Sequence, residues 1–114
     1  MKRFGQTVLL KDDPELIRKY EKYHANPWPE VIASTRKCGV ERIFIYRYGR
    51  QLFMFMETVD DFDLERDMPK YTEEPKAREW DLLMRAFQEP PPGAPPGATW
   101  VQMKEVYTQE AEPR

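Results

Sequence analysis

The sequence has few of the residues on which several classes of protein depend. Its 114 residues include only one cysteine and one histidine, so an internal disulfide and the usual four-ligand zinc site are both excluded, and we expect no metal site. Lysine and arginine nowhere form a block, and 18 basic against 20 acidic side chains leave a formal charge of −2. That balance argues against nucleic acid as a partner.

Long hydrophobic runs are also missing. No apolar stretch approaches the ~20 residues that span a bilayer, and Lys2, Arg3 and Gly5 interrupt the region where a signal peptide would carry its apolar core. We therefore expect a cytoplasmic protein with no membrane partner. What the sequence does contain is 40% hydrophobic and 13% aromatic residues, which is enough to build one core in a chain of single-domain length.

Residue spacing and turn residues predict the order of the elements. Alternating apolar and β-branched residues, with a two-residue turn at Gly49-Arg50, predict strands at 2–10, 40–48, 51–57 and 100–107. Helical spacing, with proline at the starts, predicts helices at 14–25, 29–38, 62–68 and 75–87. Proline lacks the amide hydrogen that hydrogen bonding in helices and in strands requires, so the proline-rich segment 89–98 is predicted to be a wrapping loop. The polar residues 109–114 are predicted to be a flexible tail.

This order predicts an α+β domain of the ferredoxin-like split βαβ kind over residues 1–108. In such a domain the helices cover one face of the sheet. The second strand nevertheless carries Ile43 and Ile45 on one face and Phe44 on the other, although a face that meets water should be polar. We therefore expect a homodimer in which two sheets pack face to face. The alternative is that loop 89–98 covers the second face.

His24 is the one side chain whose ordinary pKa lies near neutrality. The predicted first helix places it one turn after Tyr20, on the same face and at the helix C-terminus. The helix dipole favours the imidazolium there while burial opposes it, so we expect a pKa near neutrality, which suits acid–base catalysis. The alternative is a histidine that only ends a helix beside tyrosines.

Other side chains have both a structural and a catalytic interpretation. Trp28, held between two prolines, is either a pocket wall or a core anchor, and Glu30 is either a catalytic carboxylate or a complement to the helix dipole. Tyr46 and Trp80 are aromatic residues with a polar group, a type that either stacks on sugar faces or fills a core.

Taken together, the sequence resembles the sugar mutarotase family that includes L-rhamnose mutarotase, especially its L-fucose mutarotase branch. Three segments carry the resemblance: YEKYHANPWPEV at 20–31, GVERIFIYRYGRQLFMFMETVDDF at 39–62 and EWDLLMRAFQEP at 79–90. The resemblance implies a dimeric α/β-barrel sandwich of ferredoxin-like subunits, no cofactor, and exchange between the anomers of a deoxyhexose monosaccharide. It places the family's general-acid histidine on His24 and its substrate-contacting tyrosine on Tyr20.

The resemblance is incomplete at two positions. Rhamnose enzymes carry a tyrosine at the start of the second strand, where this chain has Ile43, and two adjacent tryptophans on the late helix, where it has Glu79 and Trp80. These differences favour L-fucose over L-rhamnose. We expect His24 to donate a proton to the ring oxygen. The residues expected around the sugar are Tyr20, Trp28, Tyr46, Glu79 and Trp80, with Glu30 or Glu79 as the base.

A fold does not determine a function, so other activities stay open at this point. An L-rhamnose mutarotase is the nearest alternative. The same dimeric sandwich also supports cofactor-free monooxygenases and non-catalytic modules that bind a small molecule or a protein partner.

Overall fold

A computed structural model describes residues 1–109, so positions 110–114 of the predicted tail lie outside it. The sheet has the strand order β2-β3-β1-β4, and every pair of neighbours is antiparallel. This is the order that a split βαβ unit produces, which confirms the α+β, ferredoxin-like prediction. The strands are β1 (Lys2–Leu10), β2 (Val40–Tyr48), β3 (Gln51–Thr58), β4 (Gln88–Glu89) and β5 (Val101–Met103).

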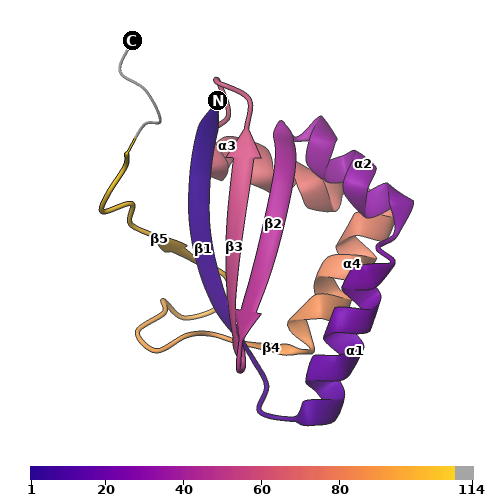
Figure 1. Ribbon diagram of the computed structural model, residues 1–114. Coiled ribbons are helices and arrows are strands. Elements are labelled where there is room, and N and C mark those ends of the chain that lie inside the picture. Colours follow the sequence, from indigo (N-terminus) through magenta and orange to yellow (C-terminus); the bar gives the residue numbers. More distant parts are fainter. Residues whose placement is uncertain (110–114) are drawn as a thin grey trace.

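The three longer helices begin at the predicted prolines and lie to one side of the sheet (Figure 1). They are α1 (Pro14–Ala25), α2 (Pro29–Lys37) and α4 (Pro75–Arg85). Proline fits the first helical position because its missing N–H would be unpaired there. Acidic side chains cap two of these helices: Asp13 accepts from the Glu15 N–H at 2.9 Å and Glu74 from the Ala77 N–H at 2.7 Å. The short predicted helix at 62–68 is replaced by α3 (Leu64–Asp67) and the 3-10 helix η1 (Met68–Glu73).

The fourth strand of the domain differs from the predicted one. Its place beside β1 is taken by β4, which pairs with Leu9 and Leu10, and the predicted loop 89–98 therefore begins inside a strand. The predicted strand 100–107 is reduced to β5, which pairs with Gly5–Thr7 on the same edge of β1. The alternation of apolar and polar residues continues past Met103, but a strand also needs a partner strand to pair with. The prediction of a strand was therefore wrong for residues 104–107.

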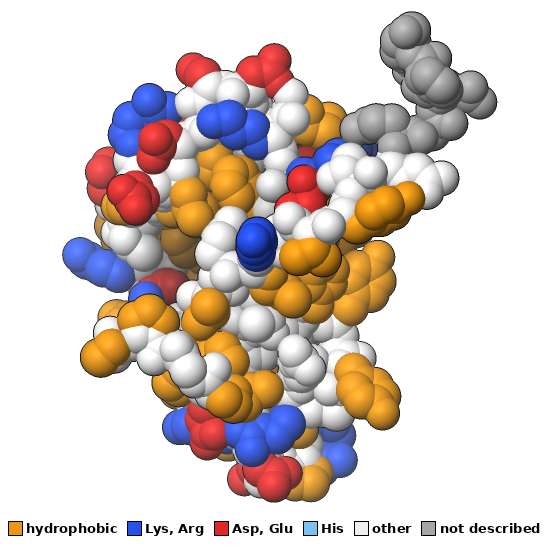
Figure 2. Space-filling model, turned by 90° about the vertical axis from the view of Figure 1, so that its left-hand side faces the viewer, with side chains coloured by type: hydrophobic (Ala, Val, Ile, Leu, Met, Phe, Trp, Pro, Cys, Tyr) orange, Lys and Arg blue, Asp and Glu red, His pale blue; other side chains and the backbone are white. Residues whose placement is uncertain are grey.

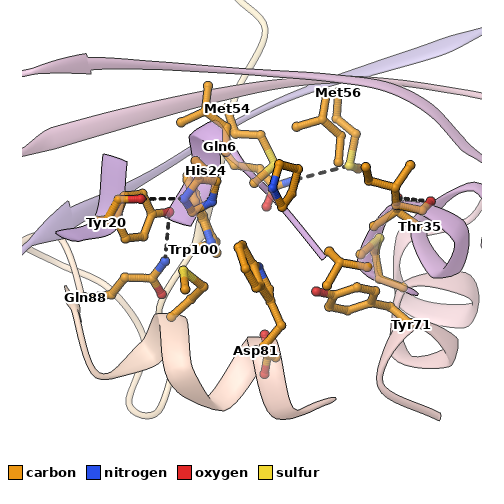
Figure 3. Close-up of a pocket in the computed structure, with 18 residues that line it drawn as sticks. Gln6, Tyr20, His24, Thr35, Met54, Met56, Tyr71, Asp81, Gln88 and Trp100 are labelled. Atoms are coloured by element: carbon orange, nitrogen blue, oxygen red, sulfur yellow. Dashed lines mark hydrogen bonds between the residues drawn. The ribbon is translucent and has the colours of Figure 1, made fainter. Parts of the chain in front are cut away.

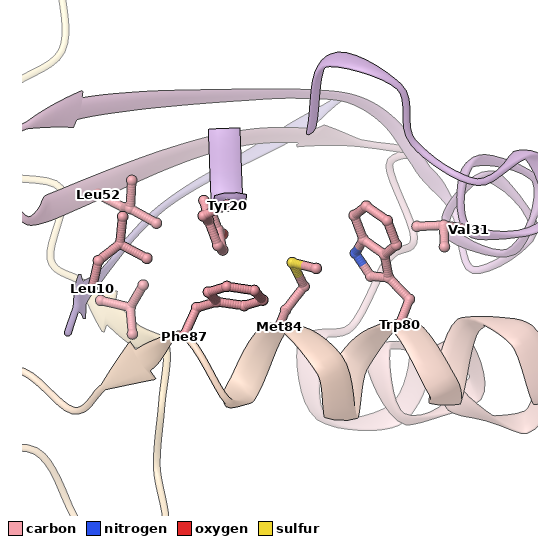
Figure 4. Packing of buried hydrophobic residues seen from close by; sticks show 8 residues of the cluster. Leu10, Tyr20, Val31, Leu52, Trp80, Met84 and Phe87 are labelled. Atoms are coloured by element: carbon pink, nitrogen blue, oxygen red, sulfur yellow. The ribbon is translucent and has the colours of Figure 1, made fainter. Parts of the chain in front are cut away.

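The main core lies between the sheet and the helices α1 and α4 (Figure 4). Two residues predicted to belong to the site, Tyr20 and Trp80, are part of this core, with only 3% and 5% of their surface exposed. Their rings are therefore held by packing on several sides. The buried cluster consists of Val8, Leu10, Tyr20, Val31, Leu52, Trp80, Met84 and Phe87.

The opposite face of the sheet is apolar and exposed. Cross-strand pairing sets Phe44 beside Phe55 and Tyr46 beside Phe53 on the same face, and 41% of Phe44, 63% of Tyr46 and 37% of Phe53 remain exposed. Loop 89–98 therefore does not cover this face, contrary to the alternative considered from the sequence. Figure 2, which looks onto the side formed by β1 and β5, shows hydrophobic side chains gathered in patches there.

Gly39 closes α2 with a φ of 104°, as its place after the helix predicts. A Cβ at this position would lie 3.0 Å from Val59 Cγ2 and 3.3 Å from Phe62 Cδ1. We expect Gly39→Ala to lower the free energy of unfolding by about 1–3 kcal/mol, measured by urea denaturation. Gly49→Ala is the matched control, because Gly49 also has a positive φ but has no atom within 4 Å of the built Cβ. An equal loss in both variants would contradict the role given to crowding at Gly39.

Candidate active site

A cavity of about 510 Å³ lies between the helix-facing side of the sheet and the helices (Figure 3). This volume falls in the range of small-molecule sites, ~300–1,000 Å³. The walls are mainly apolar, with a small number of polar groups among methionine, isoleucine and tryptophan side chains. Those polar side chains are Gln6, Tyr20, His24, Thr35, Tyr71, Asp81 and Gln88.

Two successive turns near the end of α1 bring Tyr20 and His24 together at one end of this cavity. Their rings stack with centroids 4.3 Å apart and an interplanar angle of 28°. The i, i+4 spacing that was visible in the sequence therefore does place both side chains in one site. Burial raises the pKa of Tyr20 to about 12, with a smaller opposing effect of its hydrogen bond to Gln88, so its hydroxyl stays protonated at neutral pH.

The protonation state of His24 follows from its surroundings. Burial lowers the pKa of the imidazole below its ordinary value, and a hydrogen bond to the Tyr20 backbone opposes this less strongly. Nδ1 lies 2.9 Å from the Tyr20 carbonyl oxygen. A carbonyl oxygen only accepts hydrogen bonds, so Nδ1 carries the proton of the neutral ring and Nε2 carries the lone pair. At neutral pH the geometry thus suits His24 to accept a proton through Nε2.

Trp80 forms a wall of the cavity, and Trp28 supports it from behind. The Trp80 ring makes T-shaped contacts with the His24 ring, at a centroid distance of 5.3 Å, and with the Trp28 ring, at a centroid distance of 5.1 Å. Trp28 is half-buried and does not itself line the cavity. The Nζ of Lys76 lies over the Trp28 ring, 5.7 Å from its centroid.

Three predicted site residues, in addition to Trp28, do not line this cavity. Tyr46 lies on the opposite face of β2 from Ile43 and Ile45 and does not line this cavity, but it lines a second pocket that Tyr20 and His24 also border. Glu30 is exposed in the first turn of α2, and Glu79 is exposed on α4, where it accepts from Lys76 at 3.2 Å. The structure therefore brings neither expected carboxylate base into the cavity. The carboxylate that does line it is Asp81, which is paired with Arg85 at 2.9 Å.

Three further residues of the cavity, none of them among the site residues expected from the sequence, come from β1 and its edge. Gln6 lies on β1, Gln88 on β4, and Trp100 immediately before β5. Gln6 stood in the sequence as one polar position between apolar ones on the helix-facing side of a strand, and this was the signal available for it. Gln88 and Trp100 gave no such signal, because only the pairing of their segments with β1 brings them to the cavity.

The described residues were also compared with the requirements of a metal site and of a membrane-spanning helix. Within residues 1–109, no three His, Cys, Asp or Glu side chains are grouped so that they could hold a metal ion. In the same range, none of the helices is both long and apolar enough to cross a membrane.

Comparison with known proteins identifies the family. The family model described as L-rhamnose mutarotase matches residues 3–109. An L-fucose mutarotase of Xanthomonas campestris is 33% identical over 109 residues, covering 94% of this chain and 87% of that protein. An L-rhamnose mutarotase of Oceanobacillus iheyensis is 35% identical over 63 residues, covering 54% of this chain and 59% of that protein.

Two further comparisons extend this result. A UPF0734 protein of Dictyostelium discoideum is 43% identical over 110 residues, covering 93% of this chain and 88% of that protein. Among solved structures, an L-rhamnose mutarotase of Formosa agariphila superposes with a TM-score of 0.69 at 19% identity, covering 96% of this chain and all of that one. At that identity the likeness shows a shared fold. Together with the family match, these findings show that the chain belongs to the L-rhamnose mutarotase family and is an isomerase of the sugar mutarotase type.

Proposed function

We propose that this protein interconverts the α and β anomers of L-fucose by opening and closing the sugar ring. The observation that carries the proposal is the pair formed by His24 and Tyr20 at the end of an otherwise apolar cavity. It combines a neutral imidazole with a free lone pair and a protonated phenol, which are a base and an acid within one site.

The two groups can carry out ring opening without a further reagent. His24 Nε2 takes the proton from the anomeric hydroxyl, the C1–O5 bond breaks as C1=O1 forms, and O5 takes the proton of the Tyr20 hydroxyl. After rotation about C1–C2, O5 attacks C1 and the C1–O5 bond re-forms as C1=O1 becomes a single bond. The imidazolium returns its proton to O1, and O5 returns its proton to the Tyr20 phenolate. This reverses the role expected for His24 from the sequence, because a neutral ring in the tautomer set by the Tyr20 carbonyl accepts a proton first.

The choice of L-fucose is supported by sequence coverage and by the cavity wall. The L-fucose mutarotase relative matches nearly the whole chain, whereas the L-rhamnose mutarotase relative matches about half of it. Ile43 lines the cavity at the position where the sequence comparison expected a tyrosine in rhamnose enzymes. An isoleucine there offers no hydrogen bond to a sugar hydroxyl, and such a contact is what distinguishes two deoxyhexoses that differ in hydroxyl orientation.

We also propose that a second copy of this chain covers the exposed sheet face. The two central rows of this face, Phe44-Phe55 and Tyr46-Phe53, carry no charge. A neighbouring row is ionic, with Arg42 and Glu57 paired at 2.6 Å. An apolar area bordered by charges suits association of two like surfaces about a two-fold axis, because the same patch then serves both subunits.

The test is exchange NMR at the anomeric protons of equilibrated L-fucose and L-rhamnose. We expect added protein to increase α-to-β exchange above the uncatalysed rate, more for L-fucose than for L-rhamnose at equal concentration. A preference for L-rhamnose would overturn the choice of sugar and leave the mutarotase activity in place. No increase with either sugar would overturn the proposed activity on these deoxyhexoses.

A further inference from the structure

We propose that Gln88 is a positioning residue that directs the Tyr20 hydroxyl proton into the cavity and so sets Tyr20 as the proton donor to the sugar. The inference rests on the proposed function, since it concerns the acid of the same reaction. It is carried by the contact between a buried amide on β4 and a buried phenol on α1 (Figure 3).

The contact fixes which group donates. Gln88 Nε2 donates to the Tyr20 hydroxyl oxygen at a donor–acceptor distance of 3.4 Å. A hydroxyl has one proton and two lone pairs, so an oxygen that accepts from Gln88 directs its own proton elsewhere. Without this contact the proton could rotate freely, and only part of the population would present it to a ligand.

The neighbouring imidazole does not take that proton. The ring of His24 stacks on the ring of Tyr20, with a 28° angle between the planes. The lone pair of Nε2 lies in the plane of the imidazole, so a stacked arrangement does not point it at the Tyr20 hydroxyl. The remaining direction for the phenolic proton is the cavity, where the ring oxygen of a bound sugar would accept it.

Gln88 is held by backbone pairing and by burial. It lies directly opposite Leu10 in the ladder between β1 and β4, and the Lys11 N–H donates to the Phe87 carbonyl at 2.9 Å in the adjacent position. Only 7% of Gln88 is exposed. Burying an amide in a mainly apolar site is costly unless it is hydrogen-bonded, and among residues 1–109 the Gln88 side chain bonds to Tyr20 alone. The amide is thus held by the β1–β4 ladder and by burial at the place where it makes this one contact.

The isosteric variant Gln88→Glu tests the direction of the proton. A protonated carboxyl can donate to Tyr20 as the amide does, whereas a carboxylate can only accept and would draw the Tyr20 proton away from the cavity. The quantity to compare is the ratio of the Q88E exchange rate to the wild-type exchange rate at the same pH. We expect this ratio to be near one at acid pH. The ratio should fall by ~10-fold or more as the carboxyl ionises, since positioned proton transfer contributes ~10²–10⁴-fold.

Other ionisable groups near Gln88 must be separated from this effect. Those on the elements packed around it are Tyr20 and His24 on α1, the Asp81–Arg85 pair on α4 and the Arg50–Glu89 pair beside β4. All of them are present in the wild type, so dividing by its rate removes their own titration. The variant Tyr20→Phe has no phenolic proton. The ratio of the exchange rate of the double variant Y20F/Q88E to that of Y20F should therefore not fall with pH.

Gln88→Met is the second variant, because it keeps the length of the side chain and removes the hydrogen bond without adding a charge. We expect a lower rate with a pH profile of unchanged shape. A Q88E profile that parallels the wild type, or a pH-dependent fall that persists in the Y20F background, would overturn the inference. Absence of exchange in the wild type would instead overturn the proposed function, so the two failures are distinguishable.

Discussion

Replacing His24 with alanine is expected to lower the catalysed exchange of L-fucose anomers by ~10²-fold or more, measured by exchange NMR after subtraction of the uncatalysed rate. The reason is that His24 Nε2 holds the free lone pair at the end of the cavity, since Nδ1 is bonded to the Tyr20 carbonyl. In the wild type, the rate should fall on acidification through a pKa below the ordinary value of histidine, because burial lowers it and the protonated ring cannot accept.

Lys22→Ala is the control for this variant. Lys22 lies in the same last turn of α1 but is exposed, so its removal should leave the exchange rate unchanged. Far-UV circular dichroism of both variants checks that α1 still forms. Exchange at the wild-type rate in a folded H24A protein would remove His24 from the mechanism, and a rate that rises on acidification through the same pKa would show that the imidazolium is the active form.

Replacing Phe55 with glutamate is expected to convert a dimer into a monomer. Phe55 lies in the middle strand of the exposed face, with Phe44 opposite it on one side and Gly5 on the other. In a dimer of the proposed kind, both copies of the new carboxylate would be buried without a cationic partner, at a cost of several kcal/mol each. Light scattering coupled to size-exclusion chromatography should therefore show twice the chain mass for the wild type and the single chain mass for F55E.

The same substitution on another surface provides the control. Leu82 is a large apolar residue on α4 with 64% of its surface exposed, so L82E should keep the mass of the wild type. A wild type that is already monomeric at micromolar concentration, or an F55E protein that remains dimeric, would contradict the proposed association through this face.

The parts of the site that could be predicted from the sequence are those set by local spacing. Tyr20 and His24 are four residues apart in a helix whose start was marked by Asp13 and Pro14, so their proximity follows from helix geometry alone. The strands at 40–48 and 51–57 were equally local, because a two-residue turn sets the register between them.

The same geometry already indicated that two expected site residues would not line this cavity. Residues 43 and 46 are separated by an odd number of positions in a strand, so Tyr46 cannot face the same side as Ile43. Glu79 precedes Trp80 by one residue on a helix, which turns it about 100° away from the buried face. In both cases the backbone period turns the side chain away from this cavity.

Other features could not be reached from local patterns. The positions of Gln88 and Trp100 depend on which segments pair with the free edge of β1, and two segments share that edge. Two-residue and three-residue strands leave almost no periodic signal. The protonation state of His24 likewise depends on burial by residues far away in the sequence, including Trp80.

The pairing of β5 with β1 joins almost the last described residues of the chain to almost the first, with Met103 opposite Gly5. Contacts so distant in sequence slow folding, because the intervening chain must be ordered before they form. During synthesis, the N-terminal strand would leave the ribosome long before its partner strand at 101–103 was made. Trp100 and Gln88 join the cavity only through these pairings, so a nascent chain could not complete this cavity before residues 101–103 had been made.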